Sequence, residues 1–162
     1  MMQIAVELAT VDDLYREYPA WFMKQFLSIA YAMVSRNASE SMWDEEDGFF
    51  YDVLRKGDGS STRLKVRSMV GLIPLCAVQL FEQDVMEQLP ELGTILQGLR
   101  DKYPDRRSPF HDPRLEGYDK RHLLSVLDEH NLRRVLTIML DPDEFLGDHG
   151  IRLISKLHEA DP

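Results

Sequence analysis

The chain has 162 residues, 44% of them hydrophobic, and a net charge of −9. This length and apolar content suffice for one globular unit with its own core. The negative charge argues against nucleic acid and anionic membrane surfaces as partners, since both need clustered Lys and Arg side chains. No run of about 18 apolar residues and no basic leader followed by an apolar stretch is visible, so we expect a cytoplasmic protein without a membrane span.

The first part of the chain predicts two helices. Residues 1–9 have the pattern of a short helix, and residues 12–36 that of a longer one. Pro19 lies inside the longer pattern, and because a proline lacks a backbone donor, we expect either a kink there or a true start near Tyr18. The apolar face of this helix is expected to comprise Phe22, Phe26, either Ile29 or Ala30, and Met33.

A β-hairpin is expected next, after a loop over residues 37–47. Its strands cover residues 48–55 and 62–66. The segment 56–61, which is rich in Gly, Ser and Asp, has the composition of the turn that joins them.

Residues 68–81 form an apolar run with the length of a buried helix rather than a strand. Cys76 lies in this run and is expected to be a buried, inert thiol. The rest of the chain is expected to comprise a helix over 84–102 that is interrupted near Pro90, an irregular loop over 103–120, a short strand over 122–127, and a helix over 131–140 with Asp128 as its N-cap.

The run from Met42 to Leu54 combines acidic and aromatic side chains around a single glycine. Burying an unpaired carboxylate costs several kcal/mol, so aromatic faces beside carboxylates suggest a surface that binds sugars. Trp43 and Tyr51 would then stack on sugar rings, while Asp47 and Asp52 would accept hydrogen bonds from hydroxyls. The alternative is that the aromatic rings pack the hairpin onto helices and the acidic residues form a solvated loop.

Three segments resemble successive signatures of glycoside hydrolase family 63, in its branch of glucosidase-like and mannosylglycerate hydrolase-like proteins. They are Trp43–Asp52, Leu64–Leu75 and Phe145–Arg152. The resemblance implies an inverting hydrolase of α-glucosides or related α-mannosides. It also implies a mainly α fold with short β-hairpins that forms part of an (α/α)6 barrel, the six-hairpin glycosidase-like toroid, with residues 1–162 as a partial catalytic domain.

The catalytic residues of such an enzyme are expected to lie outside this chain. The family's general acid and general base belong to motifs that residues 1–162 do not contain, so no catalytic residue is assigned and the chain alone is expected to be inactive. Its partners would be the carbohydrate substrate and the remainder of the same catalytic domain. The alternative is a standalone, non-catalytic helical module that binds carbohydrate or another protein.

Supporting residues are expected beside the acidic run. Lys65 and Arg67 would point the same way in an extended segment. They could bind a carboxylate or a sugar hydroxyl, but we expect them to form ion pairs with Asp47 or Asp52 and so to hold the loop in shape without touching the sugar. No metal or cofactor is expected, because the acidic run lacks the alternating Asp spacing and the distal Glu of a calcium loop.

The last of the three segments contributes two further candidates for substrate contact, His149 and Arg152. Relatives in the resembled family often carry Ser-Pro-Tyr-Gly where this chain has Gly-Asp-His-Gly at 147–150. His149 would then replace the usual aromatic contact by hydrogen bonding, and the alternative is a histidine that is merely exposed in its loop.

Overall fold

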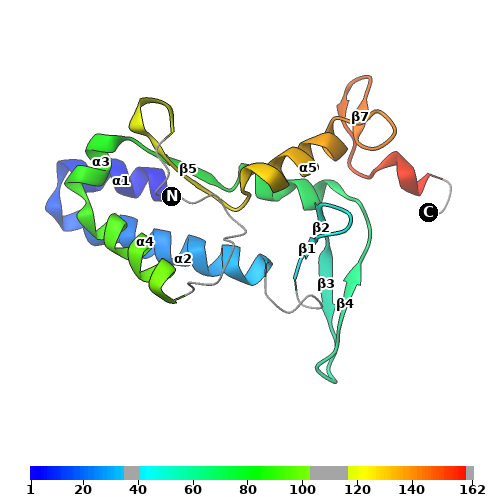
Figure 1. Ribbon diagram of the computed structural model, residues 1–162, viewed down its shortest axis with the longest axis horizontal. Helices are drawn as coiled ribbons and strands as arrows, with labels where there is room; N and C mark the ends of the chain where they lie inside the picture. The colour runs from blue at the N-terminus through cyan, green and yellow to red at the C-terminus, as the bar shows by residue number, and fades with distance from the viewer. Residues whose placement is uncertain (35–40, 103–116, 160–162) are drawn as a thin grey trace. The chain divides into compact units, whose positions relative to one another are not determined.

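The computed structural model describes residues 1–34, 41–102 and 117–159 (Figure 1). The chain divides into two compact units, and each is built from two separate stretches of sequence. The helical unit comprises Met1–Ala30 and Ala77–Asp128, and the hairpin unit comprises Tyr31–Cys76 and Glu129–Pro162. No helix in the described part of the chain is both long enough and apolar enough to cross a membrane.

Among its described residues, the helical unit combines four α-helices, which lie together in Figure 1, with one two-stranded sheet. Strands β5 and β6 pair antiparallel, with Phe81 opposite His122. The elements are α1 (Met2–Val11), the 3₁₀ turn η1 (Asp13–Tyr15), α2 (Glu17–Met33, whose last residues pass into the hairpin unit), β5 (Val78–Phe81), α3 (Gln83–Gln88), α4 (Pro90–Lys102), η3 (Tyr118–Lys120) and β6 (His122–Ser125).

Helix α2 begins at Glu17, so Pro19 lies in its first turn. A proline there costs no hydrogen bond, because the first amides of a helix have no partner within it. The expected start near Tyr18 is therefore confirmed. The expected apolar face is wrong in its first part, because Phe22 and Phe26 are only half-buried and the residues that follow each of them are buried instead. The buried residues of the helix are Pro19, Met23, Leu27 and Ala30.

The hairpin unit contains three two-stranded antiparallel sheets and one complete α-helix among its described residues. Its core includes Phe49, Phe50, Val135 and Phe145, all at most 2% exposed. The elements are β1 (Trp43–Asp44), β2 (Phe49–Phe50), β3 (Asp52–Arg55), β4 (Ser61–Leu64), the 3₁₀ segment η2 (Met69–Cys76), α5 (Glu129–Met139), β7 (Leu146–Gly147), β8 (Gly150–Ile151) and η4 (Lys156–His158).

The expected hairpin is confirmed as β3 and β4, with Asp52 opposite Leu64 and Arg55 opposite Ser61. Residues 48–50 belong instead to a preceding hairpin, in which β1 and β2 pair around a tight turn. The predicted loop over 37–47 therefore contains a short strand. The helix predicted over 131–140 is present as α5 and begins two residues earlier, whereas most of the loop predicted over 103–120 lies outside the described residues.

The helix predicted over residues 68–81 is wrong. The chain forms the 3₁₀ segment η2 and then strand β5, because Pro74 interrupts helical hydrogen bonding and Ser68 pairs with Ile154 in an isolated β-bridge. Cys76 is exposed rather than buried, which corrects the second expectation for this run.

The expectation of part of an (α/α)6 barrel is also wrong. About half of the described residues are helical, and they form no barrel or toroid. Such a fold requires long helices paired into an inner and an outer ring. Here Pro and Gly residues break the apolar runs into short elements, and the described part of the chain contains four separate two-stranded sheets.

Candidate functional site

The three sequence segments that resemble a glycosidase meet inside the hairpin unit. Phe49 stacks on Phe145 with ring centroids 5.7 Å apart, and Gly71 lies directly against the Phe49 ring. The backbone N–H of Met69 donates to the carbonyl of Leu153 at 2.7 Å. Segments that are distant in sequence thus pack into one core, and backbone hydrogen bonding also joins them.

Asp44 organises the turn between β1 and β2. Its Oδ1 accepts hydrogen bonds from the backbone N–H groups of Glu46 and Asp47 at 3.0 and 2.9 Å. The turn closes at Gly48, whose φ of +66° is a conformation that glycine adopts without steric cost. An Asp that bonds to amides two and three residues ahead is a common way to fix such a turn.

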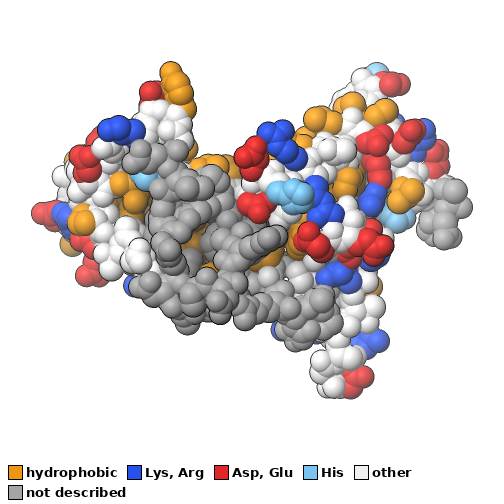
Figure 2. Space-filling model, viewed as in Figure 1, with side chains coloured by type: hydrophobic (Ala, Val, Ile, Leu, Met, Phe, Trp, Pro, Cys, Tyr) orange, Lys and Arg blue, Asp and Glu red, His pale blue; other side chains and the backbone are white. Residues whose placement is uncertain are grey.

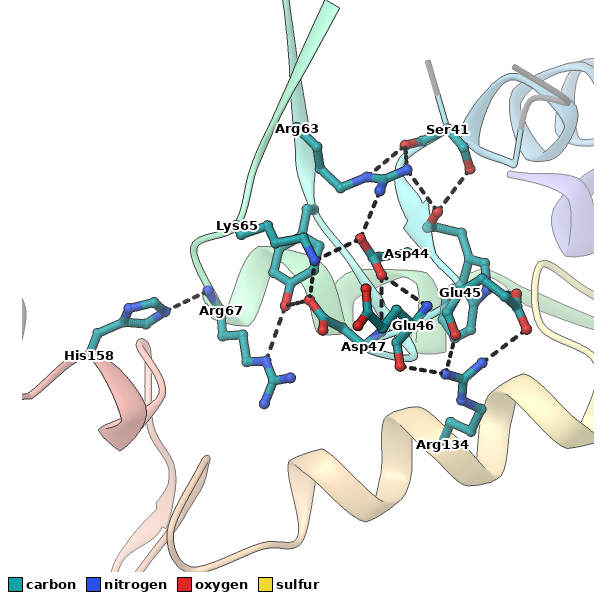
Figure 3. Close-up of polar contacts among 12 residues, drawn as sticks. Ser41, Asp44, Glu45, Glu46, Asp47, Arg63, Lys65, Arg67, Arg134 and His158 are labelled. Carbon is teal, nitrogen blue, oxygen red and sulfur yellow. Dashed lines mark hydrogen bonds and ion pairs between the residues drawn. The ribbon is translucent and has the colours of Figure 1, made fainter. Parts of the chain in front are cut away.

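The other oxygen of Asp44 binds two cations (Figure 3). Arg63 Nη1 donates to Oδ2 at 2.7 Å, and Lys65 Nζ lies 3.1 Å from the same atom. Burial raises the pKa of the Asp44 carboxyl, but the Asp47 amide, Lys65 and Arg63 outweigh it and hold that pKa below its ordinary value. Asp44 is therefore ionised at neutral pH.

Arg63 also fixes the strand that leads into the turn. Its Nε and Nη2 both donate to the carbonyl of Ser41, at 3.2 and 2.9 Å, and Nη2 donates to the carbonyl of Trp43 at 3.2 Å. One guanidinium thus joins β4 to the backbone of β1. Its planar fork of donors suits several acceptors at once, which a lysine ammonium does not.

A second chain of polar contacts runs from Asp47 through Tyr51 and Arg67 to Glu144. The Tyr51 hydroxyl donates to Asp47 Oδ2 at 2.9 Å, and Arg67 Nε donates to that hydroxyl at 3.1 Å. Arg67 Nη1 forms an ion pair with Glu144, 77 residues further along the chain. Glu144 also accepts a hydrogen bond from Ser155 Oγ, so this chain of contacts reaches the segment after β8.

The ionisation of this chain follows from its contacts. Burial raises the pKa of Asp47, but hydrogen bonds from Lys65 and Tyr51 bring it below its ordinary value. Burial raises the pKa of Tyr51, so its hydroxyl keeps the proton that it donates to Asp47. Since Asp44 and Asp47 are both held in the charged form, neither is suited to donate a proton as a general acid at neutral pH.

Trp43 lies in the core of the hairpin unit. The residue is 7% exposed, and its ring packs edge-on against Phe50 at 4.9 Å and donates from Nε1 to Glu45 Oε2 at 2.7 Å. The guanidinium of Arg134, on α5, lies 5.6 Å from the ring centre and donates to the carbonyls of Glu45 and Glu46. Such cation–π contacts stabilise an aromatic residue in place.

The residues predicted from sequence to contact sugar occupy different environments. Trp43 and Tyr51 are buried and Asp47 is half-buried, whereas Asp52 and His149 are exposed. Their sugar-binding roles stay predictions. Figure 2 shows acidic and basic side chains intermingled on the visible face of the hairpin unit, around α5 and β7.

Arg152 is half-buried and donates from Nη1 to three backbone carbonyls, those of Pro142 at 3.1 Å, Glu144 at 3.2 Å and Leu146 at 2.6 Å. This arrangement fixes the chain leading into β7. Its predicted contact with substrate also stays a prediction.

The predicted ion pairs are confirmed for one residue and wrong for the other. Lys65 Nζ lies 3.0 Å from Asp47 Oδ2, as expected. Arg67 pairs with Glu144 instead of Asp47 or Asp52, and reaches Asp47 only through the Tyr51 hydroxyl.

Sequence reasoning missed four residues that hold the site together. Asp44 had a local signal, because an Asp ahead of a glycine turn often bonds to the turn amides. Arg63, Arg134 and Glu144 had none, since each acts on a segment distant in sequence. Within the described ranges, no group of three or more His, Cys, Asp and Glu side chains is placed to hold a metal ion.

The chain is similar to a yeast protein. The uncharacterized protein YMR196W of Saccharomyces cerevisiae is 31% identical over 179 aligned positions, which include 100% of this chain and 16% of the yeast protein. The chain therefore spans about a sixth of that relative's length. No protein-family model matches the sequence, and no solved structure matches the chain.

Proposed function

We propose that the chain is a segment of a longer inverting glycoside hydrolase that acts on α-glucosides or related α-mannosides. In this proposal it contributes side chains that contact the sugar, while the catalytic carboxylates lie elsewhere in the longer protein. The observation that carries the proposal is the convergence of the three family-like segments in one unit, through the Phe49–Phe145 stack and the Arg67–Glu144 ion pair.

The charge state of Asp44 and Asp47 supports a non-catalytic role for this segment. An inverting glycosidase needs one carboxylic acid that is protonated, and a second carboxylate roughly 6.5–9.5 Å away that activates water. Asp44 and Asp47 each have a lowered pKa because cations and amides bind them. They are suited to shape the turn rather than to transfer a proton.

Exposed polar side chains supply the sugar contacts in this proposal. Asp52 stands at the start of β3 and His149 lies in the turn between β7 and β8, both open to solvent. Carboxylate and imidazole groups can bind sugar hydroxyls as acceptor and as donor or acceptor. The hairpin from which Asp52 projects is held in shape by contacts among Asp47, Tyr51, Lys65 and Arg67.

The remainder of the longer protein is the second partner in this proposal. All of the chain aligns with 16% of its yeast relative, which favours a segment over a standalone module. Large exposed apolar patches often mark contact surfaces. The hairpin unit exposes such side chains on and beside η2 and after β8, namely Val66, Met69, Val70, Ile73, Leu153, Ile154 and Leu157.

The experiment that tests this function measures sugar release by the complete reading frame in which these 162 codons lie. We expect hydrolysis of an α-glucoside or an α-mannoside, and we expect Asp52→Asn to raise KM about three- to tenfold without changing the unfolding midpoint. Asp58→Asn, in the exposed turn of the same hairpin, is the matched control and should leave KM unchanged. No sugar release by the complete protein, or equal KM for Asp52→Asn and the unmodified protein, would overturn the proposal.

A further inference from the structure

A pocket of about 340 Å³ opens on the hairpin unit where the chain leaves β8. It is lined by Arg152, Ile154, Ser155, Lys156, His158 and Glu159. This volume falls within the range of about 300–1,000 Å³ that is usual for small-molecule sites. We infer that the pocket binds a small anion carrying a phosphate or carboxylate group, a role that goes beyond sugar hydrolysis.

Arg152 lines this pocket, and its guanidinium is held in a fixed orientation. Its Nη1 is held by the carbonyls of Pro142, Glu144 and Leu146, which orients the whole planar group. Its Nε and Nη2 donate to no other residue in the described part of the chain. An arginine anchored at one nitrogen and open at the others is suited to forked binding of phosphate or carboxylate oxygens.

His158 offers a second donor. Its Nε2 accepts a hydrogen bond from the backbone N–H of Arg67 at 3.0 Å (Figure 3). The neutral ring must then carry its proton on Nδ1, which makes that atom a donor. Among residues 1–34, 41–102 and 117–159, no side chain or carbonyl accepts from Nδ1, so it is free for a ligand.

Lys156 adds a second full positive charge. Its Nζ lies 3.7 Å from Asp143 Oδ1, and because the Asp143 side chain is 88% exposed, this is a weak surface pair. Among the described residues, Glu159 supplies the only carboxylate that lines the pocket. Two cations thus face one anion at this place, in a chain whose overall charge is −9. That local excess of positive charge favours an anionic ligand.

The test is an NMR titration of the 162-residue chain, observed through its backbone amides at constant ionic strength. The probes are inorganic phosphate and glucuronic acid, with glucose as the uncharged control. We expect saturable shifts from at least one anion, confined to amides around Arg152–His158, and none from glucose. Binding of phosphate alone or of glucuronic acid alone would identify which of the two anionic groups the pocket prefers.

Two lysine variants make the test specific. Lys156→Gln should weaken anion binding about tenfold, the effect of losing one charge-assisted hydrogen bond. Lys24→Gln removes the same charge from an exposed position on α2 and should leave the affinity unchanged, while Lys156→Arg should retain binding. The absence of saturable shifts up to about 10 mM, above the millimolar range of weak sites, would overturn the inference. Equal weakening of anion binding by Lys156→Gln and Lys24→Gln would also overturn the inference.

Discussion

Arg63 and Asp44 form an ion pair of 2.7 Å in which the side chains are only 19% and 6% exposed. Since little water reaches this pair, either charge is costly to leave alone. Asp44→Asn keeps the shape of the side chain but removes its charge, so we expect the free energy of unfolding to fall by about 3 kcal/mol. Urea denaturation followed by the fluorescence of buried Trp43, in a Trp21→Phe background, measures this loss.

Glu46→Gln is the matched control for that variant. It removes the same charge from the same turn, but the Glu46 side chain is exposed and forms no hydrogen bond or ion pair with another described residue. Its free energy of unfolding should stay within about 0.5 kcal/mol of the unmodified chain. Similar losses from both substitutions would show that net charge, and not the buried pair, sets the stability.

Acid should destabilise the hairpin unit through the same carboxylates. The pKa values of Asp44 and Asp47 are lowered in the folded chain from an ordinary value of 3.8. The unfolded state therefore binds protons first as the pH falls, and stability is lost from about pH 5 downward through the folded pKa values. Urea midpoints measured by Trp43 fluorescence between about pH 3 and 7 should show this decline, and Asp44→Asn should flatten it. A stability that rises on acidification would contradict the assigned contacts.

Two neighbouring arginines on α5, Arg134 and Arg133, should differ in how much substitution by lysine lowers the free energy of unfolding. Arg134 is 25% exposed and binds the Glu45 side chain together with two turn carbonyls, whereas Arg133 is 76% exposed and, among the described residues, forms an ion pair only with Glu129 one turn away. Arg134→Lys should lower the free energy of unfolding by about 1–2 kcal/mol, because an ammonium cannot replace the fork of donors. Arg133→Lys should change it by less than about 0.5 kcal/mol, and an equal effect of the two would refute the role given to Arg134.

Two glycines should respond to alanine with opposite signs. A Cβ at Gly71 would lie 2.7 Å from Phe49 Cζ, so Gly71→Ala should destabilise the hairpin unit by about 1–3 kcal/mol through overpacking. Gly93 is an exposed residue of α4 with no atom within 4 Å of such a Cβ, so Gly93→Ala should stabilise by about 0.5–1 kcal/mol. Thermal unfolding of both variants measures these changes, and a loss of stability in Gly93→Ala would contradict the second expectation.

Local sequence signals predicted the elements that local interactions determine. Alternation and a turn-rich connection indicated β3 and β4, and apolar spacing indicated α5. The run 68–81 has helical length and apolarity, but its conformation is decided by contacts with distant residues. Gly71 packs on Phe49 and Ser68 pairs with Ile154, and neither contact can be inferred from the sequence of residues 68–81.

The candidate site also combines contacts that the sequence predicts with contacts that it does not. The Lys65–Asp47 pair was predictable, because both residues flank a hairpin and carry opposite charges. The Arg67–Glu144 pair joins residues 77 positions apart, so no periodicity or spacing indicates it. The barrel expected from family resemblance failed because that resemblance rests on short segments, whereas the fold depends on the helices between them.

The most direct test of the proposed function is the identity of the sugar anomer that is released. Proton NMR can follow α-glucosides and α-mannosides incubated with the 162-residue chain and, separately, with the complete reading frame. We predict that the complete protein first releases the β-anomer, as inversion at an α-linkage requires, and that the chain alone releases no sugar above background. Release in proportion to the amount of the isolated chain, or first release of the α-anomer by the complete protein, would contradict the account.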